Sequence, residues 1–372
     1  MSDKYFDRAK LSFKPLAQRK NKVRLEEVQV RPGDAPLRLS ARAGKAAEEA
    51  AVKILGARRE NKAVILAFGA HAVKNGLSPV LIGLMERGWV THLATNGAGI
   101  IHDWEFAYQG ESSEDVAENL PKGEFGIWEE TGFYLNLALT LGAHLGLGYG
   151  ESVGLLVEQE GLIIPGAAEL LEKVQETAET DPPAAAAALD LLYSVKTLSL
   201  TAGHIRVHHP WKRFGVQAAA FRLGIPFTGH PMFGHDIIYT HPANCGAAVG
   251  RTAERDFLSF VQSVSNLDGG VYLSVGSAVM SPMIFEKALS MARNAAFNQG
   301  KNITNHSMYV VDLAESTWDW KGKGEPPMDN PAYYLRYCKT FSRCGGSMTY
   351  VQADNRDFLL ALHEALARQA AR

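Results

Sequence analysis

The stretch between residues 62 and 99 decides the fold. It contains "KAVILAFGA" at 62–70, "SPVLIGLMERGW" at 78–89 and "VTHLATNGAG" at 90–99. The outer two pieces are apolar runs of strand length, and the middle piece has the pattern of an amphipathic helix. A strand, a helix and a strand at this spacing form a βαβ unit, which favours a parallel sheet buried on both faces.

The same alternation returns after residue 200. Strand-like runs occur in "GIPFTGH", "GGVYLSVGSAV", "SMYVVDLAE" and "GSMTYVQAD", with helical patterns between them. The segment 111–200 reads as mostly helical, and 126–161 within it reads as one long helical stretch. We therefore predict an α/β fold with a doubly wound, mostly parallel sheet and helices on both faces. The expected organisation is an N-terminal arm at 1–45 and a single domain at 46–372 with a helical insert at about 111–200.

Composition narrows the class of protein. The chain has 372 residues, a formal net charge of -2 and three cysteines. This balance argues against nucleic-acid and membrane-surface partners, and so few cysteines form no disulfide framework and no metal cluster. No apolar run reaches the ~18 residues needed to span a bilayer. The opening "MSDKYFDRAK" has no hydrophobic signal core, so a cytoplasmic protein is expected.

Glycine and other small residues recur where the predicted strands end. These ends read "FGAHAVKNG", "TNGAGIIHD", "TGHPMFGHD", "VGSAV", "DLAESTWD" and "QADNRD". Ligands bind at the carboxyl ends of strands in an open parallel sheet, and bare backbone there lets an N–H group approach a phosphate or ribose. The usual GxGxxG fingerprint is absent, because "GAGIIH" has His102 in place of the third glycine. The repeated pattern still predicts a dinucleotide ligand.

The order of these strand ends resembles that in the deoxyhypusine synthase family, from about residue 60 to the C-terminus. The family's Thr-Ala-Gly-Gly turn corresponds to 95–99, its glycine-rich strand end to 276–278 and its Phe-Asp-Gly turn to 318–320. Its Ala-Asp pair before the last helix corresponds to 353–354, and Asp236 in "GHDIIYTH" matches a further aspartate. The resemblance implies an NAD-binding α/β fold and a homotetramer.

The resemblance also implies a lysine nucleophile. Pro331 lies eight residues before Lys339, as in the family, and Tyr337 stands where the family has a tryptophan. In such an enzyme NAD accepts a hydride from the carbon next to a nitrogen, and the lysine forms an imine with the resulting fragment. The implied function is therefore NAD-dependent transfer of an aminoalkyl (aminobutyl) group from a polyamine to an amine acceptor.

The resemblance assigns roles to three groups of residues. Catalysis falls to Lys339, with His235 and His102, beside His230, as candidates for moving protons. Binding of the substrate amine falls to Asp236, Asp103 and Tyr337, with no metal expected. Cofactor binding falls to Thr95, Asn96, Gly97, Gly99, Gly276, Ser277, Ala278, Asp319, Ala353 and Asp354. The chain departs from the family where Ser281-Pro282 replaces a histidine and Ile101-His102 replaces an acidic pair.

Two other functions fit the same residues. His230, His235, Asp236 and His241 cluster in the sequence and offer metal ligands, which would make the protein a metal-dependent hydrolase. A non-catalytic NAD-binding homologue is the other alternative. Individual residues also have plainer roles, since Lys339 could be a surface lysine, Asp319 could cap a loop and Asp354 could N-cap the last helix.

Overall fold

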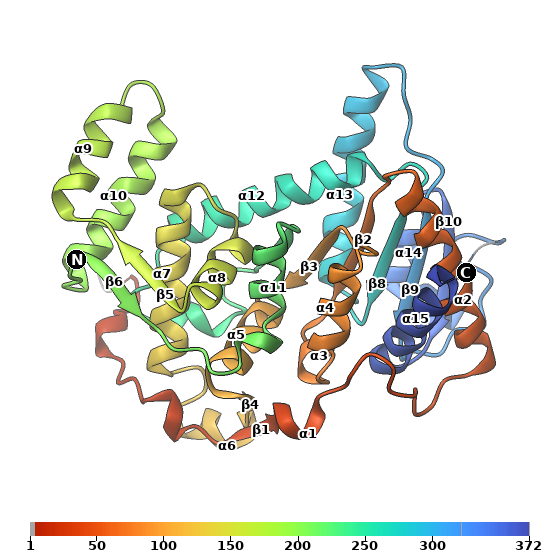
Figure 1. Ribbon diagram of the computed structural model, residues 1–372, viewed down its shortest axis with the longest axis horizontal. Coiled ribbons are helices and arrows are strands. Elements are labelled where there is room, and N and C mark those ends of the chain that lie inside the picture. Colours follow the sequence, from red (N-terminus) through yellow and green to blue (C-terminus); the bar gives the residue numbers. More distant parts are fainter. Residues whose placement is uncertain (1–3, 321, 372) are drawn as a thin grey trace. The chain divides into compact units, whose positions relative to one another are not determined.

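The computed structural model describes residues 4–320 and 322–371 (Figure 1). The outermost residues of the expected arm and domain, 1–3 and 372, lie outside this part. The described chain divides into two compact units. Unit 1 is formed from Met1–Glu27, Ile100–Ala218 and Pro231–Arg255, and unit 2 from Val28–Gly99, Ala219–His230 and Asp256–Arg372.

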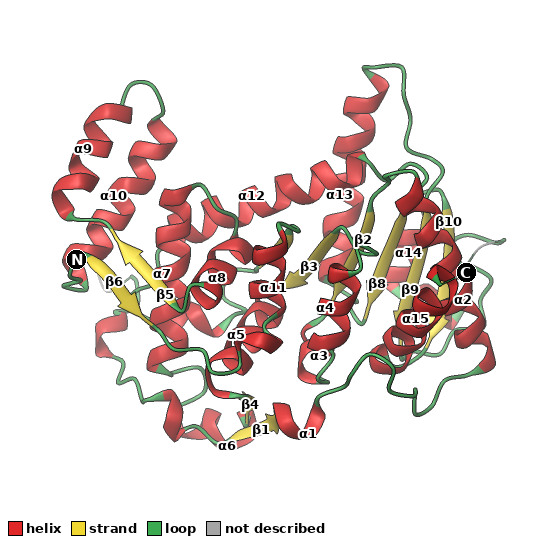
Figure 2. Cartoon of the chain, in the orientation of Figure 1, coloured by secondary structure: helices red, strands yellow, loops and turns green. Residues whose placement is uncertain are grey.

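Helices make up most of the regular structure (Figure 2). They are α1 (Leu25–Val28), α2 (Ala41–Arg59), α3 (Ala70–Lys74), α4 (Ser78–Glu86), α5 (Gly97–Gln109), α6 (Val116–Asn119), α7 (Glu129–Leu145), α8 (Tyr149–Glu158), α9 (Ala167–Thr177), α10 (Pro182–Thr197), α11 (Val216–Leu223), α12 (Gly246–Ser265), α13 (Met280–Phe297), α14 (Arg336–Ser342) and α15 (Asn355–Ala370). Because α2 begins at Ala41, the last residues of the expected arm are already helical.

Unit 2 is built on one parallel sheet of six strands. These strands are β2 (Val64–Phe68), β3 (His92–Asn96), β7 (Phe227–His230), β8 (Val271–Val275), β9 (Ser307–Asp312) and β10 (Ser347–Gln352). They lie in the order β10-β9-β8-β2-β3-β7, and every neighbouring pair is parallel. Counted along the chain, this is the 3-2-1-4-5-6 order of the dinucleotide-binding Rossmann fold. The predicted doubly wound α/β sheet is confirmed.

Burial on both faces explains why these runs form strands. Every residue of β2 and β8 is buried, as a parallel sheet covered by helices requires. Helices α2 and α15 pack together over one face, and α13 and α14 cover the other (Figure 1). The core beneath α13 joins Tyr272 of the sheet with Phe285 of the helix, whose rings stack at 4.1 Å between centroids.

Unit 1 is mostly helical and includes the segment expected as an insert. It also contains two antiparallel strand pairs that the sequence did not predict, β1 (Asn21–Arg24) with β4 (Glu111–Glu114) and β5 (Gly161–Ile164) with β6 (Gly203–Arg206). The prediction of one long helix over 126–161 is wrong. The segment forms α7 and α8, and α7 ends before Gly146, which adopts a left-handed φ of 80° that glycine tolerates and other residues avoid.

In the part of the chain that the structure describes, none of the helices combines the length and apolarity needed to cross a membrane.

Candidate functional site

The carboxyl ends of β8, β9 and β10 surround a cavity of about 300 Å³. Gly276, Ala353 and Asp354, three of the residues assigned to cofactor binding, line it. Six further residues complete the lining: His71, Asn75, Val311, Asp312, Leu313 and Asn355. This is the edge at which open parallel sheets bind ligands. The structure therefore brings part of the predicted cofactor set together within unit 2.

The sheet reverses its strand order between β2 and β8, and the residue that follows each of these two strands is a glycine. Gly69 follows β2 and Gly276 follows β8. The Gly69 amide donates to the Val275 carbonyl at 3.2 Å, and the Gly276 amide donates to the Val311 carbonyl at 2.9 Å. A Cβ atom on Gly69 would lie 2.1 Å from the Gly276 carbonyl oxygen. The two loops approach each other so closely that only a residue without a side chain fits at position 69.

Two polar side chains of the cavity are held by hydrogen bonds to other groups of the protein. Asn75 donates from Nδ2 to Asn355 Oδ1 at 2.8 Å. Asp312, the last residue of β9, accepts at Oδ1 from the Ala314 amide at 3.0 Å. Partial burial, and then the charge of Lys74, lower the pKa of His71, so its imidazole is neutral at neutral pH. The lining thus offers a carboxylate, an amide pair and a neutral imidazole.

Sequence reasoning marked the loops "FGAHAVKNG" and "DLAESTWD" but singled out neither His71 nor Asp312 from them. Their signal was available, because Asp312 ends one apolar strand and His71 lies three residues after the end of another. Asp354 lies in the cavity wall and also has the plainer role considered for it. It accepts from the Arg356 amide at 2.8 Å and N-caps α15.

The remaining residues of the predicted cofactor set serve local structure. Ser277 accepts from the Ser281 amide at 3.2 Å near the start of α13, and Ala278 is exposed. Asp319 accepts from the Gly322 amide at 2.9 Å, which is the loop cap considered for it. None of these three lines the cavity at the β8–β10 ends.

The turn at 95–99 is explained by the protein's own contacts. Asn96 accepts at Oδ1 from the Gly99 amide at 2.9 Å, as an N-cap does at the start of α5. Thr95 donates to the Phe68 carbonyl at 2.9 Å, and a Cβ atom on Gly99 would lie 2.2 Å from Thr95 Oγ1. Gly97 begins α5. The small residues therefore let the helix start against β3, which is a sufficient reason for them without a ligand.

Asp103 is buried in unit 1 and is fully engaged. Its carboxylate accepts from the Val216 and Gln217 amides, both at 2.9 Å, and from Gln217 Nε2 at 3.0 Å. Burial raises the pKa of Asp103 to about 6 although these hydrogen bonds oppose the rise. The carboxylate caps the start of α11, so its observed partners are backbone and amide groups of the protein.

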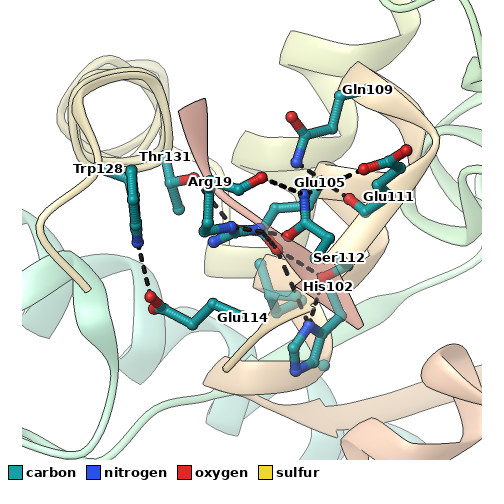
Figure 3. Close-up of polar contacts among 12 residues, drawn as sticks. Arg19, His102, Glu105, Gln109, Glu111, Ser112, Glu114, Trp128 and Thr131 are labelled. Carbon is teal, nitrogen blue, oxygen red and sulfur yellow. Dashed lines mark hydrogen bonds and ion pairs between the residues drawn. The ribbon is translucent and has the colours of Figure 1, made fainter. Parts of the chain in front are cut away.

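His102 belongs to a buried polar cluster in unit 1 (Figure 3). Its Nδ1 lies 2.6 Å from Ser112 Oγ, and Ser112 donates to Glu105 Oε2 at 2.5 Å. Arg19 donates to both oxygens of Glu105, at 2.8 and 2.6 Å, and Thr131 donates to Oε1 at 3.1 Å. Sequence analysis missed this ion pair, because its partners are 86 residues apart.

The histidine cluster of the sequence is divided between the units, with His230 in unit 2 and His235, Asp236 and His241 in unit 1. His230 Nε2 lies 2.9 Å from Thr228 Oγ1, and burial lowers the pKa of His230 to about 3. His241 accepts at Nδ1 from the Ala243 amide at 3.1 Å, while its Nε2 is 3.5 Å from Glu129. No group of three or more His, Cys, Asp or Glu side chains among the described residues is arranged to hold a metal ion.

Asp236 keeps a feature expected of an amine-binding group, while His235 beside it is exposed. Burial raises the pKa of Asp236 to about 6, so the carboxylate is still mostly ionised at neutral pH. Its Oδ2 atom is buried and has no hydrogen-bond partner among the described residues. A buried acceptor without a donor is costly, and a ligand ammonium would relieve that cost.

Lys339 has different neighbours from those expected. Tyr337 and Lys339 are two residues apart on a helix and therefore do not face each other. Tyr337 points into the hydrophobic core. Lys339 Nζ instead lies 3.1 Å from Glu325 Oε1 and 3.3 Å from the centroid of the Tyr333 ring. Desolvation alone would lower the pKa of Lys339, but Tyr333 and Glu325 outweigh it and hold the pKa above its ordinary value.

Comparisons with known proteins do not establish a family. No protein-family model matches the chain, and no curated protein sequence does. Among solved structures, AgrE in a ternary complex with ornithine and NAD+ is similar at 15% identity and a TM-score of 0.43, over 90% of this chain and 35% of that one. A conserved LOR/SDH protein from Methanococcus maripaludis S2 is similar at 11% identity and 0.43, over 92% and 75%.

ArgZ, an arginine dihydrolase from the ornithine-ammonia cycle in cyanobacteria, is similar at 13% identity and a TM-score of 0.41, over 89% of this chain and 33% of that one. The chain thus spans about a third of the length of the ArgZ and AgrE chains. All of these TM-scores are below 0.5, so the likenesses carry no argument about function. The fold assignment stands on the strand order of unit 2.

Proposed function

We propose that unit 2 binds NAD and that the protein catalyses NAD-dependent chemistry on a small amine. The observation that carries this proposal is the cavity at the β8–β10 ends of a sheet with Rossmann strand order. Gly276 lines this cavity without a side chain, and the Gly69 loop packs directly against it, since a Cβ atom on Gly69 would lie 2.1 Å from the Gly276 carbonyl oxygen. We infer that the backbone at Gly276, together with the strand order, serves a dinucleotide in place of a GxGxxG sequence.

The chain's own residues supply the polar recognition. Asp312 can accept hydrogen bonds from ribose hydroxyls, since a carboxylate has lone pairs beyond the one that caps Ala314. The neutral His71 can donate from one ring nitrogen and accept at the other. Bound NAD+ would supply a hydride acceptor for the carbon next to a ligand nitrogen. Within unit 1, the buried Oδ2 atom of Asp236 is the candidate acceptor for an ammonium group.

An Asp312→Asn variant tests the cofactor site. Asparagine still accepts from the Ala314 amide, so the loop is kept while the negative charge is lost. We expect calorimetric titration with NAD to show binding about 10- to 150-fold weaker than in the wild type, since hydrogen bonds to charged groups contribute about 1.5–3 kcal/mol. The matched control is Asp329→Asn at an exposed loop position, which should bind NAD like the wild type. Absence of NAD binding to the wild-type protein would refute the proposed function.

Aminoalkyl transfer through Lys339 is the finer form of this proposal. The lysine nitrogen would form a C=N bond to the oxidised carbon while the leaving amine departs with a proton, so Lys339 must first become neutral. Its raised pKa makes the neutral form scarce at pH 7. A proton acceptor must therefore take the ammonium proton, and Glu325 at 3.1 Å is the observed neighbour that can receive it.

Borohydride trapping tests this transfer. With NAD and spermidine present, reduction should fix the aminobutyl group on the peptide containing Lys339, with a yield that rises from pH 7 to pH 9. Glu325→Gln removes the proton acceptor next to Lys339, so the yield at pH 7 should fall several-fold although the loss of the negative charge also lowers the pKa of Lys339. The control is Lys339→Arg, which should give no adduct. Labelling that is equal in the wild type and the Lys339→Arg variant would rule out this lysine.

A further inference from the structure

A second cavity in unit 2, of about 520 Å³, lies along the edge strand β10 and against α2. Three cationic side chains line it, Arg38, Arg42 and Lys45. It shares Leu313 and Ala353, and also Asp354, with the cavity at the β8–β10 ends. A ligand that occupies one cavity is therefore next to the other.

The local structure fixes where these cations stand. Arg42, Lys45 and Glu49 succeed one another at helical spacing, so they share one face of α2. The segment that carries Arg38 is pinned by the buried carboxylate of Asp357, which accepts from the Leu37 and Arg38 amides at 2.8 Å each. The cationic wall is therefore built on a helix and on an anchored loop.

The charges of Arg38, Arg42 and Lys45 are not neutralised by short ion pairs within the described part of the protein. Among the described residues, neither Arg38 nor Arg42 has a carboxylate within ion-pair distance, and Lys45 reaches only Glu49 at 3.9 Å. Glu49 and Asp354 also line the cavity, which leaves a net positive lining. Asp354 is already engaged as the N-cap of α15. The start of α2 is likewise capped by Ser40, so the side-chain cations carry the charge.

We propose that this second cavity binds the anionic oxygen group of a ligand, with Arg38 and Arg42 as the main partners. Guanidinium groups pair with carboxylate and phosphate oxygens through two parallel N–H donors, which suits either source. One source is the carboxylate of a substrate amino acid next to the cofactor, and this version rests on the proposed function. The other is a phosphate of the cofactor itself.

Two pairs of probes separate these sources by calorimetry at low salt. Ornithine, which the AgrE structure contains, differs from putrescine by a carboxylate, and NADP differs from NAD by a phosphate. We expect one anionic member to bind at least tenfold more tightly than its partner. Arg42→Gln should remove that preference, while Arg59→Gln, at an exposed position on the last turn of α2, should keep it.

The outcomes are distinct. A lost ornithine preference in Arg42→Gln assigns the site to a carboxylate, and a lost NADP preference assigns it to a phosphate. Equal binding within both pairs, no binding of any probe, or a preference that survives Arg42→Gln overturns the inference. An ornithine preference that depends on Arg42 without any NAD binding would refute only the proposed function. NAD binding without either preference would refute only this inference.

Discussion

Replacing Arg19 by methionine should lower the free energy of unfolding by about 3–5 kcal/mol, the usual cost of removing one member of a buried ion pair. The guanidinium and the Glu105 carboxylate are almost fully shielded, with side-chain exposures of 2% and 1%. Without Arg19, Glu105 keeps hydrogen bonds from Ser112 and Thr131 but has lost its bidentate cation partner. Urea denaturation followed by circular dichroism measures the difference.

The neighbouring residue provides the control. Lys20 pairs with Glu118 at 3.5 Å, and both side chains are exposed. Exposed ion pairs contribute at most about 1 kcal/mol, so Lys20→Met should cost no more than that. Arg19→Met with Glu105→Gln removes both charges and should cost less than the sum of the single variants. If Arg19→Met were no more harmful than Lys20→Met, the ion pair would contribute nothing to holding the N-terminal segment in unit 1.

The same variant has a predictable pH dependence. In the wild type burial opposes ionisation of Glu105, but Arg19 outweighs it and holds the pKa of Glu105 below its ordinary value. The stability from this group is therefore present at neutral pH and is lost as the pH falls through that lowered pKa. In Arg19→Met burial is opposed only by the remaining contacts with His102 and Ser112, so the pKa of Glu105 rises. The variant then gains protons on folding, so its deficit relative to the wild type should shrink from pH 7 toward pH 4.

Apolar runs made the strands of unit 2 predictable, while pairings between distant segments were not. The run that gives β2 is buried at every residue, so composition alone indicates a strand. The partners of Arg19 could not be predicted, because nothing local in the sequence marks a contact across 86 residues. The break between α7 and α8 was hard to predict for a different reason. Gly146 lies within an otherwise continuous apolar pattern, which by itself indicates one unbroken helix.

The candidate site was predictable only in part, for a related reason. Strand ends can be read from the sequence, and this located Gly276 and Ala353 at one edge. Which strand ends are neighbours depends on the strand order, and this order places β8 between β2 and β9. The contact of Gly69 with Gly276 joins loops that are far apart in the chain. A glycine that serves such a contact looks in sequence like a glycine that serves a turn.

Gly69→Ala should separate these two roles of glycine. The backbone of Gly69 has φ −82° and ψ 162°, which any residue adopts, so alanine brings no strain of conformation. Its Cβ atom would nevertheless lie 2.1 Å from the Gly276 carbonyl oxygen. The obstacle is backbone rather than a flexible side chain, so the β2 and β8 loops must move apart. We expect a loss of about 2–3 kcal/mol, in the range for overpacked sites, measured by urea denaturation.

The free energy of NAD binding should weaken by at least as much as the free energy of unfolding falls in this variant, because the displaced loops flank the cofactor cavity. The matched control is Gly56→Ala in α2, where an added Cβ atom meets nothing within 4 Å. Alanine there should stabilise the helix by about 0.5–1 kcal/mol and leave NAD affinity unchanged. If Gly69→Ala kept both the wild-type stability and the wild-type NAD affinity, the close approach at the strand-order reversal would be unnecessary. If instead the variant lost stability but kept the wild-type NAD affinity, the cofactor would have to bind elsewhere than at this edge of the sheet.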